Sequence, residues 1–168
     1  MSRLVILGAG GYGNTVKDIA EQIGYEVIQL DDADIVHPLA SFLEYINSYT
    51  EFIPAFGNNE FRISWLDKLQ DAGALLATLI HPTAYVSPKA KIGKGVVILP
   101  HAIVNTDVVI KRGCILNLGC MIDHGCVIEE GVHLCLGCIV KGENRVKAFT
   151  KIEAGEMIEA RIWPVKKA

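Results

Sequence analysis

The chain has 168 residues, 51% of them hydrophobic and 21% charged, and its formal net charge is −3. This length and apolar content fit one domain, or two small ones, with a sizeable core. Lysine and arginine are not concentrated in any stretch, which argues against binding to nucleic acid or a membrane surface. No apolar run approaches the roughly 18 residues that cross a bilayer, and the N-terminal one is too short for a signal peptide. We therefore expect a cytoplasmic protein with no membrane insertion.

The first 80 residues have the pattern of a small α/β unit. The apolar run at 4–7 predicts a buried strand, and the apolar spacing over 16–23 predicts a helix that ends near Gly24. A second strand is expected at 27–30, which completes a β-α-β unit.

Two further helices and two further strands are expected in this unit. A short helix is predicted around 39–46 and a third strand at 52–56, where Pro54 favours an edge or irregular position. Asn58 is placed to cap a longer helix. Residues 75–80 are expected to form a last strand that leads directly into the second half of the chain.

A glycine-rich loop follows the first strand. Gly8, Gly10 and Gly13 satisfy G-x-G-x-x-G between a strand and a helix, and Asp31 ends the next strand about 20 residues on. This motif alone suggests NAD, but a unit with one clear β-α-β is too short for a full dinucleotide fold. A glycine turn used only for packing is the alternative.

The second half of the chain repeats with a period of six residues. Every sixth residue from Ile80 to Ile158 is aliphatic, without an insertion. The series is Ile80, Val86, Ile92, Ile98, Val104, Ile110, Leu116, Ile122, Ile128, Leu134, Val140, Val146, Ile152 and Ile158. Three such hexads make a triangular coil, in which residues 18 apart stack about 4.8 Å above one another. The period predicts a parallel β-helix filled by three aliphatic ladders.

The corners of the predicted coil are marked by glycines three residues after an aliphatic position, where unusual backbone angles are needed. They are Gly95, Gly113, Gly119, Gly125, Gly131, Gly137 and Gly155. The period does not fix the hand of the coil, and the general rule for parallel crossovers favours a right-handed one.

Four of the five cysteines lie four residues after an aliphatic position, in a slot that elsewhere holds alanine or valine. They are Cys114, Cys120, Cys126 and Cys138. A buried free thiol behaves as a small apolar residue, so we expect core filling rather than a metal or redox site at the C-x-x-C of Cys135 and Cys138. Cys120 and Cys138 are one coil apart, a separation that permits a bridge under oxidation.

Several segments together resemble one family, the NeuD/PglD branch of the hexapeptide-repeat acyltransferases. They are the glycine loop, residues 57–59, the entry to the repeats at 79–84, the hexads 92–97 and 110–115, and residues 117–124. The similarity covers about residues 1–142. It implies an α/β, Rossmann-like lobe followed by a left-handed parallel β-helix, assembled as a homotrimer. It also implies acetyl transfer from acetyl-CoA to a UDP-linked amino-sugar amine or a sialic acid hydroxyl.

The resemblance assigns roles to residues at one corner of the coil. His124 matches the general base, which removes a proton from the attacking amine or hydroxyl. Gly142, one coil above, matches the residue whose N–H stabilises the oxyanion. Asn117 matches a position near the acceptor sugar. Gly125 stands where relatives often have an acidic residue that orients the histidine, so we expect Asp123 to replace it, although adjacent strand residues point oppositely.

The resemblance also implies binding sites for the two substrates. The expected nucleotide-sugar residues are Gly8, Gly10, Gly11, Tyr12, Gly13, Asp31 and Asp32, together with Asn117. Many relatives have histidine where this chain has Tyr12, which predicts altered acceptor choice or reduced activity. The expected CoA residues are Cys135, Gly137 and Gly142.

The C-terminal end departs most from the repeat. Glu143 stands in a glycine slot and Asn144 in a small-residue slot, and the chain is expected to lack the extra coils that line the outer CoA site in relatives. Trp163 and Pro164 are expected to close the open end of the coil. The expected domains are a nucleotide-sugar lobe at 1–80, the β-helix at 81–160 and a cap at 161–168.

Three other functions are alternatives to sugar acetylation. A non-catalytic sugar-nucleotide-binding or scaffold trimer is the alternative, and a nicotinamide oxidoreductase is a distant third. A zinc-dependent carbonic anhydrase is disfavoured because His81, His101 and His133 lack its spacing, so we expect no metal.

Overall fold

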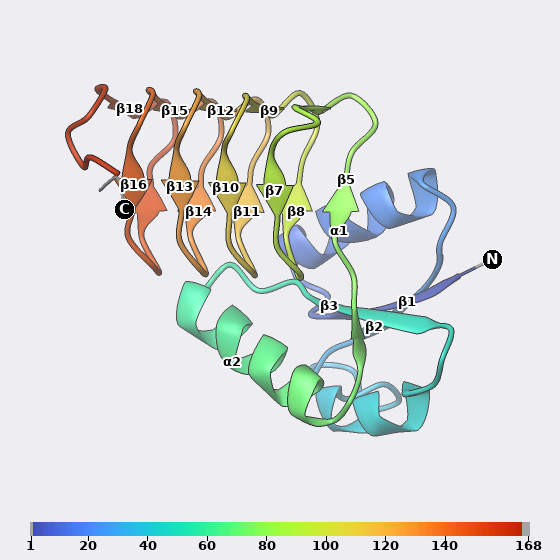
Figure 1. Cartoon of the computed structure of the whole chain (residues 1–168). Helices are drawn as coiled ribbons and strands as arrows, with labels where there is room; N and C mark the ends of the chain where they lie inside the picture. Colours follow the sequence, from blue (N-terminus) through green and yellow to red (C-terminus); the bar gives the residue numbers. More distant parts are fainter. Residues whose placement is uncertain (1, 166–168) are drawn as a thin grey trace. The chain divides into compact units, whose positions relative to one another are not determined.

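The computed structural model describes residues 2–165 of the chain (Figure 1). By its internal contacts the chain divides between Leu79 and Ile80 into two compact units, each of which is described by itself. No helix within the described range is long and apolar enough to cross a bilayer.

The N-terminal unit is a four-stranded parallel sheet with the strand order β2-β1-β3-β4. Its strands are β1 (Arg3–Leu7), β2 (Glu26–Leu30), β3 (Thr50–Pro54) and β4 (Leu75–Leu76). Its helices are α1 (Gly11–Gln22), the 3₁₀ helix η1 (Leu39–Tyr45) and α2 (Asn59–Asp71). Helix α1 covers one face of the sheet, and η1 and α2 cover the other (Figure 1). The predicted α/β unit is therefore confirmed.

The predicted helix boundaries follow from backbone chemistry. Helix α2 begins where the Asn58 side chain accepts a hydrogen bond from the Phe61 N–H at 2.8 Å, as expected for an N-cap. Helix α1 is followed by Gly24, whose φ of 94° suits only glycine at low cost. Strand β1 is buried on both faces, since residues 4–7 have no exposed surface.

Two expectations for this unit were wrong in detail. Strand β3 lies inside the sheet and not at its edge, because β4 pairs with it over Glu51 and Phe52. Pro54 is tolerated because it is the last residue of β3, beyond the end of β4, and its nitrogen points away from β1. Residues 75–80 form two separate short strands, β4 and β5, that belong to different sheets.

The C-terminal unit is a parallel β-helix built from two-residue strands, as the period predicted (Figure 1). It is left-handed, as the resemblance implied and contrary to the general rule for parallel crossovers. Sheet I contains β7 (Lys91–Ile92), β10 (Val109–Ile110), β13 (Val127–Ile128) and β16 (Arg145–Val146). Sheet II contains β5 (Leu79–Ile80), β8 (Val97–Ile98), β11 (Ile115–Leu116), β14 (His133–Leu134) and β17 (Lys151–Ile152). Sheet III contains β6 (Tyr85–Val86), β9 (Ile103–Val104), β12 (Met121–Ile122), β15 (Ile139–Val140) and β18 (Met157–Ile158).

The 18-residue spacing is confirmed by the strand register. Paired residues such as Ile110 and Ile128, or Ile122 and Val140, differ by one coil of 18. The aliphatic positions from Ile98 to Ile158 and the four predicted cysteines form one buried cluster. The prediction that these thiols fill the core is confirmed, since each is 0% exposed.

The corner slot is defined by its backbone angle rather than by glycine. All seven predicted corner glycines have positive φ. Five other residues in equivalent positions share this conformation, with φ between 58° and 61°: His101, Asp107, Glu143, Phe149 and Arg161. The coil therefore continues unchanged where its glycines disappear, at some cost in backbone strain.

Asn144 organises the C-terminal end of the coil. Its side chain is fully buried, and its Nδ2 donates to the carbonyls of Lys141 at 2.8 Å and Glu159 at 2.9 Å. Its Oδ1 accepts from the Trp163 N–H at 2.9 Å, and the Trp163 side chain packs partly against the aliphatic core. Pro164 forms a bridge with Asn144. The last three residues of the expected cap, 166–168, lie outside the described range.

Candidate active site

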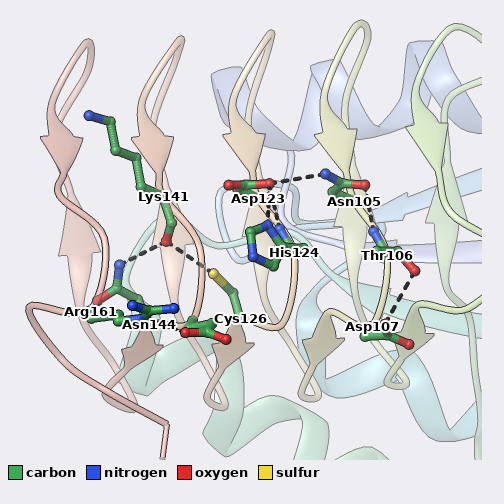
Figure 2. Close-up of polar contacts among 10 residues, drawn as sticks. Asn105, Thr106, Asp107, Asp123, His124, Cys126, Lys141, Asn144 and Arg161 are labelled. Carbon is green, nitrogen blue, oxygen red and sulfur yellow. Dashed lines mark hydrogen bonds and ion pairs between the residues drawn. The ribbon is translucent and has the colours of Figure 1, made fainter.

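His124 and Asp123 meet in the turn that follows β12. The carboxylate Oδ1 of Asp123 accepts hydrogen bonds from the His124 backbone N–H at 2.7 Å and from the imidazole Nδ1 at 2.9 Å (Figure 2). The side chain of Asp123 therefore contacts the ring as expected, and strand alternation does not separate the two residues, because both lie beyond the end of the two-residue strand. A proton on Nδ1 leaves the lone pair of Nε2 free to act as a base.

Asn105 supports this pair from one coil below. Its Nδ2 donates to Asp123 Oδ1 at 3.0 Å, and its own Oδ1 accepts from the Thr106 N–H at 2.7 Å (Figure 2). The sequence interpretation missed Asn105. The 18-residue spacing was the signal that could have found it, since it places Asn105 directly beneath Asp123.

Gly142 lies above the imidazole and is buried. A Cβ at this position would lie 2.8 Å from Cε1 and 3.1 Å from Nε2 of His124. Its φ is not among the positive ones, so glycine is needed here for space and not for a corner conformation. Within residues 2–165 the Gly142 N–H donates to no acceptor. An N–H without an acceptor beside an imidazole is chemically suited to donate to an oxyanion.

The charges around His124 act in opposite directions. Asp123 holds the pKa of the exposed imidazole above its ordinary value, mainly through their hydrogen bond. The nearby Glu143 carboxylate also raises this pKa, and Arg161, which forms an ion pair with Glu143, lowers it. Hydrogen bonds from His124 and from Asn105 hold the Asp123 pKa below its ordinary value, so this carboxylate stays ionised.

A pocket of about 510 Å³ adjoins this corner of the coil. Its lining residues are Gly125, Glu143, Arg161, Pro164 and Val165. Gly125 has positive φ, and a Cβ there would lie 3.6 Å from Glu143 Cγ. The turn at Gly125 and the Glu143–Arg161 ion pair therefore lie next to each other in the lining of this pocket. Gly125, the residue that follows His124 in the sequence, is one of its lining residues.

The N-terminal unit contains a second pocket, of about 410 Å³, at the glycine loop. Its lining residues are Gly8, Gly10, Gly11, Tyr12, Asp31, Ala55, Phe56, Gly57, Asn58 and Phe61. Five of the seven N-terminal residues predicted to bind the nucleotide are therefore brought together. Gly13 is instead packed against the loop backbone, where a Cβ would lie 2.2 Å from the Gly8 carbonyl oxygen. Asp32 accepts from the Leu39 N–H at 3.0 Å and does not line the pocket.

Asp31 and Tyr12 have different positions in this pocket. The Asp31 carboxylate accepts from the N–H groups of Ala33 at 2.9 Å and Ala9 at 2.7 Å, and these hydrogen bonds lower its pKa and fix the loop. The Tyr12 hydroxyl is buried and has no hydrogen-bond partner among residues 2–165. Burial raises the pKa of this hydroxyl above its ordinary value, and the Arg62 charge lowers it by a smaller amount. Tyr12 therefore does not exchange a proton near neutral pH.

The other predicted site residues lie at a different corner, after sheet II. Asn117 contacts the Nε2 of His133 through its Nδ2 at 3.3 Å and accepts from the Leu118 N–H at 2.8 Å. Cys135, one coil above Asn117, is only 5% exposed, and Gly137 is an open corner glycine with φ of 62°. Within one chain the structure does not bring these residues to His124.

The whole chain resembles a solved acetyltransferase. It is 33% identical to the acetyltransferase domain of PglB from Neisseria gonorrhoeae FA1090, with a TM-score of 0.86 over 94% of this chain and 82% of that one. The chain belongs to the NeuD/PglD-like sugar acetyltransferases of the hexapeptide-repeat superfamily. It is accordingly an acyltransferase, as the sequence predicted.

Other comparisons agree with this family. The PglD N-terminal domain family matches residues 3–69. PerB from Caulobacter crescentus, solved with CoA and GDP-perosamine, is 23% identical with a TM-score of 0.76, over 98% of this chain and 92% of that one. WeeI from Acinetobacter baumannii AYE is 16% identical with a TM-score of 0.71, over 100% and 93%. At these identities PerB and WeeI support the fold alone.

No group of three or more His, Cys, Asp or Glu side chains in the described part of this acetyltransferase could hold a metal ion. Acetyl transfer from a thioester needs only a base and an oxyanion donor. His124 and Gly142 lie together at one corner of the coil.

Proposed function

We propose that this sugar acetyltransferase moves the acetyl group of acetyl-CoA directly to a nucleotide-linked amino sugar, with His124 as general base. The observation that carries the proposal is the Asp123–His124 hydrogen bond of 2.9 Å, which fixes the tautomer with a basic Nε2. Gly142, packed over the same ring with its N–H unused by the described residues, supports it.

The proposed reaction needs no covalent enzyme intermediate. The sugar amine attacks the thioester carbonyl, and His124 Nε2 takes up the amine proton as the new C–N bond forms. The Gly142 N–H donates to the oxyanion of the tetrahedral intermediate. The C–S bond then breaks, and the imidazolium returns the proton to the departing CoA thiolate.

Acetyl-CoA is the co-substrate, since the PglB acetyltransferase domain, 32% identical to this chain, has been solved in complex with acetyl coenzyme A. An amino sugar carried on a nucleotide is the acceptor that the N-terminal pocket suits best. The N-cap of α1 is Gly10, which has no side chain to satisfy the first N–H groups of the helix. A helix N-terminus of this kind binds a diphosphate, a group that free sialic acid lacks.

The proposal includes a homotrimer, in which a neighbouring copy completes the site. The outward residues of sheet III form an apolar column beside the His124 corner, and four of them are at least 37% exposed. The column consists of Tyr85, Ile103, Met121, Ile139 and Met157. An exposed apolar column on a protein of this size favours burial against another copy. A second copy packed there would supply a sheet II corner, with Asn117 and Cys135, which one chain leaves apart from His124.

The oligomer is tested by light scattering coupled to size exclusion. We expect a trimer for the wild type and a smaller species for Ile103→Glu, which places a charge in the column. Lys91→Glu, an exposed outward substitution on sheet I, is the control and should leave the trimer intact. A monomeric wild type, or a trimeric Ile103→Glu, would overturn this part of the proposal.

The chemistry is tested by CoA release and mass spectrometry of the acceptor. The acceptors are UDP- and GDP-linked 4-amino sugars, their hydroxyl analogues and free sialic acid. We expect N-acetylation of an amino sugar by the wild type and a loss of about 10²-fold or more for His124→Ala. His101→Asn, an exposed corner histidine replaced by a residue that tolerates positive φ, is the control with unchanged activity.

Equal CoA release by wild type and His124→Ala would show that His124 is not the base. Acetylation of sialic acid alone would overturn the choice of acceptor. Tight nucleotide-sugar binding with no turnover of any acceptor would instead support a binding protein.

A further inference from the structure

We propose that Asn105 is a positioning residue of the acetyl-transfer site, which holds the Asp123 carboxylate against the His124 imidazole. The proposal rests on the proposed function of His124, and it assigns to Asn105 no contact with either substrate. Its basis is a chain of hydrogen bonds that crosses two successive coils on one edge of the β-helix.

The amide of Asn105 has a defined orientation. Its Oδ1 accepts from the Thr106 N–H at 2.7 Å, which leaves the NH₂ group to face the next coil. That NH₂ group donates to Asp123 Oδ1 at 3.0 Å. Both ends of the amide are therefore used, and a flipped amide would lose both hydrogen bonds.

The turn at Asn105 uses only the Oδ1 atom of this side chain. Asn105, Asn117 and Asp123 each follow an inward aliphatic residue, and each accepts from the N–H of the next residue at 2.7–2.8 Å. A side-chain oxygen at this position thus stabilises its own turn. The donation from Asn105 to the next coil has no part in the turn, because Asp123 closes its own turn without it.

The donation changes what Asp123 can do. Its Oδ1 accepts three hydrogen bonds, from Asn105, from the His124 backbone N–H and from His124 Nδ1. Two of the donors belong to His124, the next residue of the same turn, so the Asn105 amide is the contact that ties the carboxylate to the neighbouring coil. Since Asp123 and His124 are both about half exposed, water competes for this carboxylate wherever protein donors do not hold it.

Two substitutions separate the turn role from the positioning role. Asn105→Ser keeps an oxygen that can accept from the Thr106 N–H, but it is too short to reach Asp123. Asn105→Asp is isosteric and keeps the same acceptor, but it replaces the donor with a second carboxylate. Asn47→Asp is the matched control, since the exposed Asn47 also accepts at the start of a turn, from the Tyr49 N–H at 3.0 Å, in the other unit.

The readouts are steady-state kinetics and NMR of the His124 ring, whose signals are assigned by their loss in His124→Gln. For both Asn105 variants we expect kcat to fall roughly 10–100-fold, as for other residues that orient a catalytic group, with KM for acetyl-CoA within about twofold. In Asn105→Ser we expect the Nδ1–H resonance of His124 to be lost to solvent exchange. In Asn105→Asp, above neutral pH, we expect the imidazole to titrate at higher pH than in the wild type.

An unchanged Nδ1–H resonance and an unchanged imidazole titration in both variants would overturn the proposal, whatever happens to kcat, because a purely structural role predicts that outcome. If Asn105→Ser fails to fold, Asn105→Asp decides alone. If the wild type acetylates no acceptor, the proposed function fails, and the NMR readout still shows whether Asn105 orders the ring.

Discussion

Gly142 lies so close to His124 that a Cβ on the glycine would be 2.8 Å from the imidazole Cε1. Real Cβ atoms do not approach to this distance, so a side chain at position 142 must displace either the ring or the turn. Gly142 accordingly has a steric role in addition to the proposed donation from its N–H to the oxyanion.

The first prediction is that Gly142→Ala loses kcat by about 10²-fold or more while the β-helix stays folded. The methyl group pushes the imidazole away from the attacking amine, and a 1 Å misplacement is sufficient for a loss of this size. Steady-state kinetics and circular dichroism would measure both properties.

Gly119→Ala is the control for this change. Gly119 has φ of 64° and open space around it, so alanine there costs about 1–2 kcal/mol of backbone strain without touching His124. Comparable loss of kcat in the two variants would show that a disturbed corner of the coil, and not contact with the ring, explains the effect.

The second prediction concerns the pH dependence of kcat/KM. Asp123 raises the pKa of His124, and only the neutral imidazole accepts a proton, so activity should fall as pH drops through a pKa above about 6.5. Glu143 also raises this pKa, so Glu143→Gln should move the acid limb to lower pH. Arg161 lowers it, so Arg161→Gln should move the limb to higher pH.

The opposite signs make the pH prediction specific, because the two residues form one ion pair. A loss of the ion pair alone would move both variants in the same direction. Matching shifts of the limb in the two variants would therefore contradict the electrostatic interpretation.

The fold was predictable because its signal is repeated. Each coil supplies three aliphatic positions at fixed spacing, so an error at one position is corrected by the others. The position of β3 had no such repeated signal. Pro54 alone suggested that β3 is an edge strand, whereas the short strand β4 pairs with it and is the edge strand. Whether a proline can be tolerated depends on how far the neighbouring strand extends, which is a property of tertiary structure.

The candidate site was predictable where the family resemblance names residues and less so where contacts between coils decide. His124 and Gly142 were expected at one corner. Asn105 was missed because an asparagine in a turn slot is unremarkable until the residue one coil above it is an aspartate. Asp123 was doubted because strand alternation was applied to residues that lie in a turn.

The third prediction is that Asn144→Ala destabilises the C-terminal coil by about 2–4 kcal/mol. Asn144 replaces a small apolar residue in the core slot, and it is acceptable there because all three of its hydrogen bonds are made. Alanine would remove three hydrogen bonds made by a fully buried side chain and leave the Lys141 carbonyl with the weak Cys126 thiol donor, at 3.3 Å. Such a loss costs more than a single hydrogen bond is worth on average. Denaturant unfolding measures the change.

Asn47→Ala is the comparison for Asn144→Ala. Asn47 also makes side-chain hydrogen bonds, but it is exposed, so water replaces the lost partners and the change should stay within about 0.5 kcal/mol. Equal effects at the two positions would mean that Asn144 is not buried as described, or that the end of the coil is already open to water.

The last prediction concerns the thiols. All five cysteines are free and buried, four at 0% exposure and Cys135 at 5%. Burial also raises the pKa of the Cys135 thiol, which reduces the thiolate that reacts. We therefore expect the native protein to react slowly with Ellman's reagent, in a phase that Cys135→Ser removes, and the denatured protein to release five equivalents. Prompt reaction of several thiols in the native protein would show that the coil opens readily, because the four remaining cysteines are reached only by separating its aliphatic ladders.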